Sequence, residues 1–135
     1  MNKAAFSLKE YKFEKVSIDF LKRTSNELNI TFDPSGKFMS ENSTFELIIV
    51  FNAFNEDVEN SFVTIKCSSI FQFENEINFD EIPSYFYRNS IAIVFPYIRA
   101  FISTVTLQAN IPPIILPTMN LTSLEIPLKQ NTTNV

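Results

Sequence analysis

The sequence predicts an α+β fold in which a four-stranded antiparallel sheet is followed by a long helix and a short second helix. Two observations support this prediction: apolar residues first alternate as in strands, and later recur every three to four positions as in helices. Strands grouped before helices are typical of helices that pack on one face of an antiparallel sheet. The length of 135 residues favours a single domain, 1–135.

The opening strand is predicted over residues 6–20, where the parity of the apolar positions changes twice. One extra residue in a strand reverses the alternation of all later side chains, so such changes are typical of β-bulges. The pattern therefore predicts a long edge strand with irregularities near Glu10 and near Glu14. The apolar runs comprise Phe6 and Leu8, then Tyr11 and Phe13, and finally Val16, Ile18 and Phe20.

Three further strands are predicted before the helices. Residues 27–32 form a short strand, and the Asp-Pro-Ser-Gly sequence at 33–36 ends it, because Asp, Pro and Gly suit the first, second and fourth positions of a β-turn. Residues 44–54 and 61–74 form two longer strands, which a short loop joins into an antiparallel hairpin. The first strand of this hairpin is largely apolar on both faces, which predicts contacts on both sides of the sheet.

A long amphipathic helix is predicted from the apolar stripe that follows Asn89. Asn89 or Ser90 would cap this helix, and Pro96 lies in its early part. Many of its residues are β-branched, which also suits a strand, but the period of about 3.6 and the length favour a helix. The stripe comprises Ile91, Val94, Phe95, Ile98, Phe101, Ile102, Val105 and Ala109.

Shorter helical pieces are predicted on both sides of the long helix. Asp80 or Ser84 would cap a single helical turn before it. After it, a proline-rich extended segment cannot continue the helix, and a short second helix begins at Asn120 and ends at Pro127. The tail at 130–135 is expected to fray.

The composition excludes several kinds of catalytic site. The chain has no histidine, one cysteine and one glycine, which excludes a histidine general base, a Cys/His metal site and a glycine-rich phosphate loop. Cys67 lies on an apolar strand face, which indicates a buried structural thiol rather than a nucleophile. The carboxylate pairs Glu74/Glu76 and Asp80/Glu81 are typical of solvated turns. We therefore expect no enzyme activity, no catalytic or metal-binding residue and no cofactor.

Charge and hydropathy narrow the partners and the location. A net charge of -4 does not suit nucleic acid, which requires a basic patch. No apolar run reaches the roughly 18 to 20 residues that span a bilayer, and the N-terminus lacks the apolar region of a signal peptide. Together with the single cysteine, these features favour a cytoplasmic protein without membrane insertion. The 15 phenylalanines indicate either a dense core or an aromatic surface for a partner.

The region from Asn89 to Leu124 carries a recognisable pattern. A helix with the sequence FPYIR is followed, across the proline-rich segment, by a block of the form IPxxxLxxxNLxxL. This region resembles the C-terminal half of the SecB protein-export chaperones. The matching residues are Phe95, Pro96, Tyr97 and Arg99, followed by Ile111, Pro112, Leu116, Asn120, Leu121 and Leu124.

The resemblance implies an ATP-independent chaperone, or holdase, that binds unfolded or precursor polypeptides and serves protein export through the motor protein SecA. It also implies a homo-oligomer, either a dimer or a tetramer, whose main helices lie between sheets. An alternative with the same fold is a dedicated partner chaperone of a toxin–antitoxin system, which binds one specific client, the antitoxin.

The resemblance further implies where the partners bind. A groove between the sheet, a crossover loop at 21–43 and the last helix would hold the client, although its phenylalanines also suit an ordinary core. SecA would contact acidic residues of the first strand, of which one falls on Asp19 while the other falls on Lys15. The implied groove residues are Phe32, Phe38, Met39, Phe45, Phe71, Phe73, Leu121 and Leu124. The residues implied in helix packing and subunit contact are Phe95, Tyr97, Arg99 and Ile102.

Overall fold

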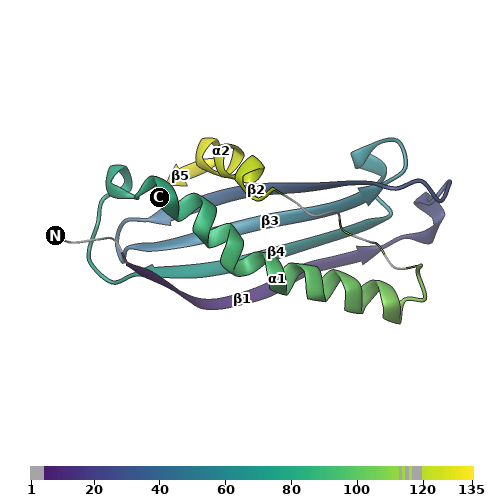
Figure 1. Cartoon of the computed structure of the whole chain (residues 1–135), viewed down its shortest axis with the longest axis horizontal. Coiled ribbons are helices and arrows are strands. Elements are labelled where there is room, and N and C mark those ends of the chain that lie inside the picture. The colour runs from purple at the N-terminus through teal and green to yellow at the C-terminus, as the bar shows by residue number, and fades with distance from the viewer. Residues whose placement is uncertain (1–4, 113, 115, 117–119) are drawn as a thin grey trace.

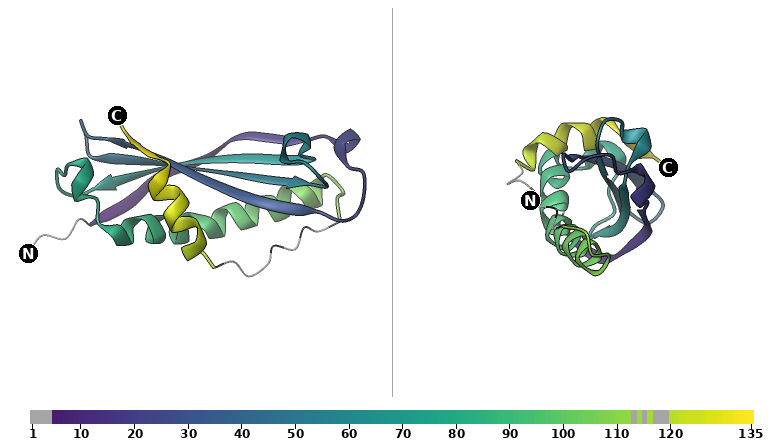
Figure 2. Two further views of the ribbon diagram at one scale, coloured as in Figure 1. Left: turned by 90° about the horizontal axis from the view of Figure 1, so that it is seen from above. Right: turned by 90° about the vertical axis from the view of Figure 1, so that its right-hand side faces the viewer.

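The computed structural model describes residues 5–112, 114, 116 and 120–135. A long twisted sheet carries two helices on one face, as the predicted α+β class requires; α1 runs along the sheet and α2 crosses it near one end (Figures 1 and 2). The strands are β1 (Phe6–Ile18), β2 (Asn29–Met39), β3 (Thr44–Phe54), β4 (Val63–Phe73) and β5 (Thr132–Asn134). The helices are α1 (Ser84–Gln108) and α2 (Thr122–Gln130), with short 3-10 helices η1 (Phe20–Lys22), η2 (Val58–Asn60) and η3 (Phe79–Glu81) in the connections.

The sheet has five strands among the described residues, in the order β1-β4-β3-β2-β5. The first four pair in antiparallel fashion, as predicted, but β5 pairs in parallel with the outer edge of β2. The prediction of a four-stranded sheet with a frayed tail is therefore wrong. The tail is ordered because its backbone groups find partners on β2, with Thr132 opposite Gly36 and Asn134 opposite Phe38.

The two predicted irregularities of β1 are confirmed. The pairing of β1 with β4 shifts register between Leu8 and Glu10 and again between Phe13 and Lys15. Each shift inserts one extra residue and so reverses which side chains face the helices. As a result, the apolar residues of these runs that lie within β1, from Phe6 to Ile18, are on the face of the sheet that carries α1.

The turn predicted at Asp33–Gly36 is wrong, because β2 continues through it as a strand. Phe32, Pro34 and Phe38 have the same parity and are buried on the helix-bearing face, so their burial favours an uninterrupted strand. Pro34 is tolerated because β5 does not reach it and β2 has no other neighbour there among the described residues. The chain turns instead at residues 40–43.

Gly36 is required by a close approach inside the sheet. A Cβ atom at this position would lie 2.3 Å from Cζ of Phe45 and 3.0 Å from Oγ1 of Thr132. Real Cβ atoms do not approach a ring carbon that closely, so the Phe45 ring occupies the space that a side chain at position 36 would take. The glycine therefore serves the packing between β2 and β3 rather than a turn.

Helix α1 begins earlier than predicted, at Ser84 instead of near Asn89 or Ser90, and Pro83 precedes it. The isolated turn before it is η3, where the carboxylate of Glu81 accepts a hydrogen bond from the Asn78 amide at 2.7 Å, so Asp80 and Ser84 do not cap it. The earlier start buries Phe86 and Tyr87, which extend the apolar stripe by one turn. Pro96 consequently lies in the middle of the helix.

Length and composition alone would allow α1 to cross a membrane. In this fold it is the core helix of the sheet, however, and such helices have the same composition. Its buried residues include Ile91, Val94 and Ile98, which face the sheet, whereas Ile93 is exposed.

Helix α2 continues past Pro127, which was predicted to end it. The proline removes one backbone hydrogen bond from the helix interior. Burial of Leu124 and Leu128 on either side of it offsets this cost, because α2 packs across β2. The carbonyl of Pro127 still accepts a hydrogen bond from the Asn131 amide at 3.0 Å, and β5 follows directly.

We expect Gly36→Ala to lower the free energy of unfolding by about 1–3 kcal/mol, because the new methyl group must displace the Phe45 ring. Urea denaturation followed by circular dichroism measures this change. Ser35→Ala is the matched control, since Ser35 lies on the opposite face of the same strand and should shift the transition by far less. Equal stability of the two variants would contradict the proposed packing.

Candidate functional site

An aromatic cluster around Phe86 fills one end of the space between the sheet and α1. The Phe86 ring lies 4.7 Å from the rings of Phe6 and Phe45, 4.9 Å from Phe73 and 5.7 Å from Phe71, measured between centroids. Edge-to-face packing of this kind adds about 0.5–1.5 kcal/mol per pair to the area buried. Sequence reasoning missed Phe86 because the long helix was predicted to begin only at Asn89 or Ser90, although Phe86 and Tyr87 continue the spacing of the helical stripe.

The predicted groove residues gather mainly on the helix-bearing face of the sheet, but most are covered. Phe38, Phe45 and Phe71 have no exposed surface. Leu121 is half-buried, and Met39, also half-buried, alternates to the opposite face of β2. The remaining predicted groove residues, which are also buried, are Phe32, Phe73 and Leu124. The structure thus brings the predicted set together as the core beneath α1 and α2, with Met39 apart.

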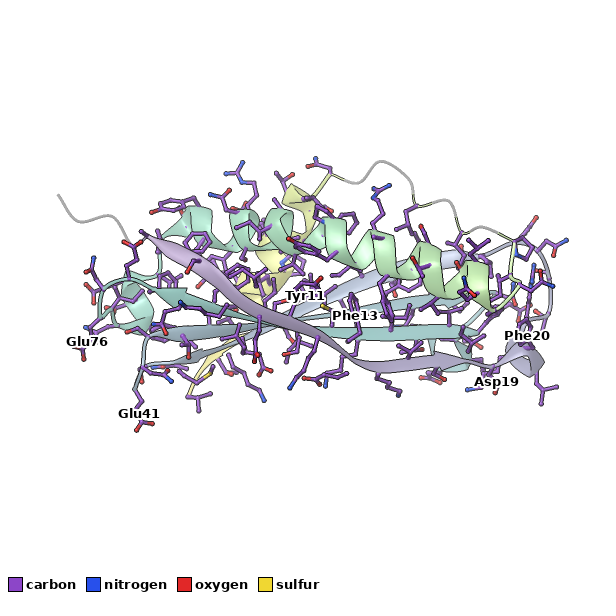
Figure 3. The ribbon with its side chains drawn as sticks, turned by 90° about the horizontal axis from the view of Figure 1, so that it is seen from below. Tyr11, Phe13, Asp19, Phe20, Glu41 and Glu76 are labelled. Atoms are coloured by element: carbon purple, nitrogen blue, oxygen red, sulfur yellow. The ribbon has the colours of Figure 1, made fainter. Side chains whose placement is uncertain are left out.

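Apolar side chains remain exposed where α1 meets β1, at the edge of the sheet. Tyr11 stacks on Tyr97 with ring centroids 4.5 Å apart, and Phe13 stacks on Phe101 at 3.8 Å. Figure 3 shows Tyr11 and Phe13 on β1 below α1. Tyr11 and Tyr97 keep 40% and 44% of their surface exposed. We call this area the β1–α1 surface; it comprises Tyr11, Phe13, Val16, Ile93, Tyr97 and Phe101.

The four residues predicted to serve helix packing and subunit contact divide into two pairs. Phe95 and Ile102 are buried against the sheet, and the Phe95 ring lies 5.2 Å from that of Phe32. Tyr97 and Arg99 are exposed, and the guanidinium of Arg99 lies 5.5 Å from the centre of the Phe95 ring. The first pair holds α1 on the sheet, whereas the second remains exposed at the surface.

Asp19 lies at the end of β1, far from the loops that carry Glu41 and Glu76 (Figure 3). Its carboxylate accepts a hydrogen bond from the Leu21 amide at 3.0 Å, and its own amide donates to the carbonyl of Phe62. The side chain therefore caps η1 and has a structural role whatever else it binds. Lys15, at the second predicted SecA position, is exposed and lies opposite Lys66 in the register of β1 and β4.

Asn55 fixes the crossover loop between η1 and β2, which is shorter than the predicted 21–43 because Asn29–Met39 form β2. Its side-chain oxygen accepts from the Thr24 amide at 2.7 Å, and its side-chain nitrogen donates to the carbonyls of Ser25 and Glu27 at 3.1 and 2.6 Å. An open hollow of about 280 Å³ lies beside this network. Leu21 of η1, which lines the hollow, is 94% exposed, so an apolar side chain stands beside the loop that Asn55 fixes.

The described residues carry little that suits catalysis. Cys67 is buried, and burial raises the pKa of its thiol; Ser69 opposes this by hydrogen bonding, and the charge of Glu14 adds to it. Burial likewise raises the pKa of Tyr87. Both groups therefore stay neutral near pH 7 and are poor nucleophiles or bases. In the part of the chain that the structure describes, no group of three or more Cys, Asp or Glu side chains could hold a metal ion.

Fold and surface together define a small α+β protein whose distinctive features are apolar contacts rather than reactive groups. The family model for the preprotein translocase subunit SecB matches residues 5–130. The chain therefore belongs to the SecB family.

Individual relatives are more distant. The chain resembles the Mycobacterium tuberculosis SecB-like chaperone Rv1957, solved in complex with a ChAD peptide from the Rv1956 HigA1 antitoxin. The TM-score is 0.63 at 14% identity, over 85% of this chain and 88% of that one. At that identity the likeness concerns the fold.

Two other proteins are similar over shorter or looser matches. An uncharacterized protein, MJ0357 of Methanocaldococcus jannaschii, is 69% identical over 32 residues, which span 24% of this chain and only 21% of that protein. A Streptococcus agalactiae protein of unknown function matches with a TM-score of 0.46 at 11% identity, over 86% of this chain and 99% of that one.

We expect Asn55→Ala to loosen the crossover loop, because it removes the partners of Thr24, Ser25 and Glu27. Hydrogen exchange of the Thr24 amide should accelerate by about tenfold, as the loss of one such bond implies. Asn60→Ala is the control, since Asn60 is an exposed residue that lines the same hollow. Unchanged exchange in the Asn55 variant would show that the loop is held by other contacts.

Proposed function

We propose that this protein is an ATP-independent holdase of the SecB type that binds unfolded or precursor polypeptides. The observation that carries the proposal is the match of the SecB family model to nearly the whole chain. The abundance of phenylalanine and the neutral, buried Cys67 thiol agree with a binding protein rather than an enzyme. Broad apolar contacts give affinity for many unfolded chains without demanding one sequence.

Client binding would use the predicted groove in an opened form. Phe38 and Phe45 are covered in the structure, so a client reaches them only if the elements above them shift. Helix α2 is the element suited to move, because it is short and rests on β2 mainly through Leu124 and Leu128. Leu121, already half-exposed at the start of α2, would meet the client first.

Self-association would use the β1–α1 surface. The outer edge of β1 has no neighbouring strand among the described residues, and the stacked pair Tyr11 and Tyr97 leaves apolar rings beside it. Such an edge lined by apolar side chains suits pairing with a second copy. We therefore propose a homo-oligomer, a dimer or a tetramer, in which the chain is a single SecB-like domain.

A second candidate function is that of a dedicated chaperone for one client, such as the antitoxin of a toxin–antitoxin system. The likeness in fold to Rv1957, solved with an antitoxin peptide, favours it. Under this alternative the protein binds one segment tightly and ignores generic unfolded chains. SecA is a less suitable partner, because Asp19 already caps η1 and Lys15 carries the opposite charge from the acidic residue expected there.

We further propose that the protein acts in the cytoplasm without membrane insertion. It also acts without nucleic acid, which its net charge of -4 does not suit. Burial of Ile91, Val94 and Ile98 against the sheet would keep α1 out of a bilayer.

Light scattering of a heat-aggregating client, with and without the protein, tests the holdase proposal. We expect suppression at one tetramer per client chain, and about three- to tenfold weaker suppression for Leu121→Ser, which removes apolar contact area. Leu107→Ser is the control, because Leu107 is 66% exposed on α1 outside the predicted groove. No suppression by the unmodified protein would reject the general holdase, whereas tight binding confined to one peptide would favour the dedicated chaperone.

Solution mass tests the proposed oligomer. We expect a dimer or tetramer by light scattering coupled to size exclusion, and a lower mass for Tyr97→Lys, because the charge would be buried between apolar rings. Ile126→Lys is the matched control, since Ile126 is 63% exposed on α2. A strictly monomeric unmodified protein would contradict the proposal.

A further inference from the structure

The outer edge of β2 is occupied by the chain's own C-terminal strand. The Gly36 amide donates to the carbonyl of Asn131 at 3.1 Å, and the Val135 amide donates to the carbonyl of Phe38 at 2.8 Å. Ser40 adds a side-chain hydrogen bond to the carbonyl of Val135 at 3.3 Å. Between these contacts, β5 pairs in parallel with residues 36–38.

Strand β5 is held mainly by its backbone. Thr132 is half-buried, whereas Thr133 and Asn134 are exposed, so the strand adds little apolar area to the core. Backbone pairing at a sheet edge does not depend on sequence, and another extended chain makes the same hydrogen bonds. A three-residue strand of polar side chains is therefore replaceable by a longer or more apolar one.

Pro34 limits where an incoming strand can pair. Residues 29–35 of β2 have no neighbour on their outer side among the described residues. Pro34, however, has no backbone N–H and so interrupts the row of hydrogen-bond donors. Ile30 and Phe32 also direct their amides to this outer side, because they share the parity of Gly36, but Pro34 separates them from the donors and acceptors of Gly36–Phe38. Strand β5 covers Gly36–Phe38, so a client strand that pairs with this part of the edge would compete with β5 directly.

We propose that this edge of β2 accepts an extended segment of client polypeptide, and that β5 is the internal occupant which the client displaces. The proposal rests on the holdase function proposed above. The client residue that replaces Thr132 would lie beside Gly36 and the Phe45 ring, because Thr132 Oγ1 is 3.0 Å from the position a Gly36 Cβ would take. Its surroundings favour an apolar side chain, which Thr132 does not supply.

Displacement of β5 would also act on α2, because only Asn131 separates the two elements. The Thr132 hydroxyl donates to the carbonyl of Leu128 at 2.6 Å, so removal of β5 takes away one of the contacts at the end of α2. Helix α2 in turn covers part of the phenylalanine face through Leu124 and Leu128. A client that takes the β2 edge would therefore help to uncover the apolar groove.

The test weakens β5 and measures client affinity. Thr133→Pro with Val135→Pro removes two backbone N–H groups that point toward β2. One of them, that of Val135, donates to the carbonyl of Phe38. Asn134→Pro is the matched control, since its amide points away from β2. The probe is fluorescein-labelled, reduced and carboxymethylated α-lactalbumin, followed by anisotropy. We expect about three- to tenfold tighter binding for the double variant than for the control. The reason is that the state in which β5 has left the β2 edge, which alone can bind the client there, becomes more populated.

A reversible crosslink tests the opposite change, in which β5 cannot leave β2. Lys37 and Thr133 face each other across the two strands, so Lys37→Cys with Thr133→Cys, in a Cys67→Ala background, would lock β5 in place when oxidised. We expect weaker client binding in the oxidised form and recovery on reduction. Equal affinity in all forms, or tighter binding when locked, would overturn the competition while leaving the holdase intact. Failure of every form to bind the probe, with folding verified by circular dichroism, would reject both.

Discussion

The fold depends on covering one sheet face that is unusually rich in phenylalanine. Helix α1 provides most of the cover, and its aromatic residues are spread along its length: Phe86 meets the cluster at one end, Phe95 packs on Phe32, and Phe101 stacks on Phe13. A helix that reaches all three must be long, which is why it runs through Pro96 without ending. Burial of large rings outweighs the loss of one helical hydrogen bond.

The elements that cover this sheet face contribute unequal amounts of buried apolar surface, which suits a binding protein. Beneath α1 the core is continuous, but α2 contributes mainly Leu124 and Leu128, and β5 contributes backbone hydrogen bonds and little apolar area. Elements held by few apolar contacts open at lower free energy than the core. We therefore expect the parts of the molecule that lie over the predicted groove to open most readily, with the strands below as a rigid platform.

Sequence reasoning succeeded where a pattern was long. The parity changes of β1 located both bulges, and the spacing from Ile91 onward located the main helix, because each pattern extends over many residues. It failed where a distant contact overrides a local preference. The Asp33–Gly36 sequence is a strong turn signal, yet pairing with β3 and the approach of the Phe45 ring hold it extended. The polar strand β5 has no hydrophobic pattern at all, so only its partner defines it.

The sequence also could not show which of these phenylalanines belong to the core and which to a groove. Alternation places Phe38, Phe45 and Phe71 on one face, but it does not say whether a helix or a client covers that face. Phe86, which covers part of that face, lies before Asn89 and Ser90, where the sequence predicts the helix to begin. The resemblance in residues 89–124, by contrast, led to the SecB family, to which the chain belongs.

Hydrogen–deuterium exchange with and without an unfolded client tests the central claim most directly, namely that this fold binds polypeptide by opening over its phenylalanine face. With client bound, amides of β2 at Gly36–Phe38 should stay protected while those of β5 exchange faster, and α2 should change its exchange as well. The strands β3 and β4 should be unaffected. If the exchange rates of β2, α2 and β5 did not change when the client is demonstrably bound, the account would be contradicted and the binding surface would lie elsewhere.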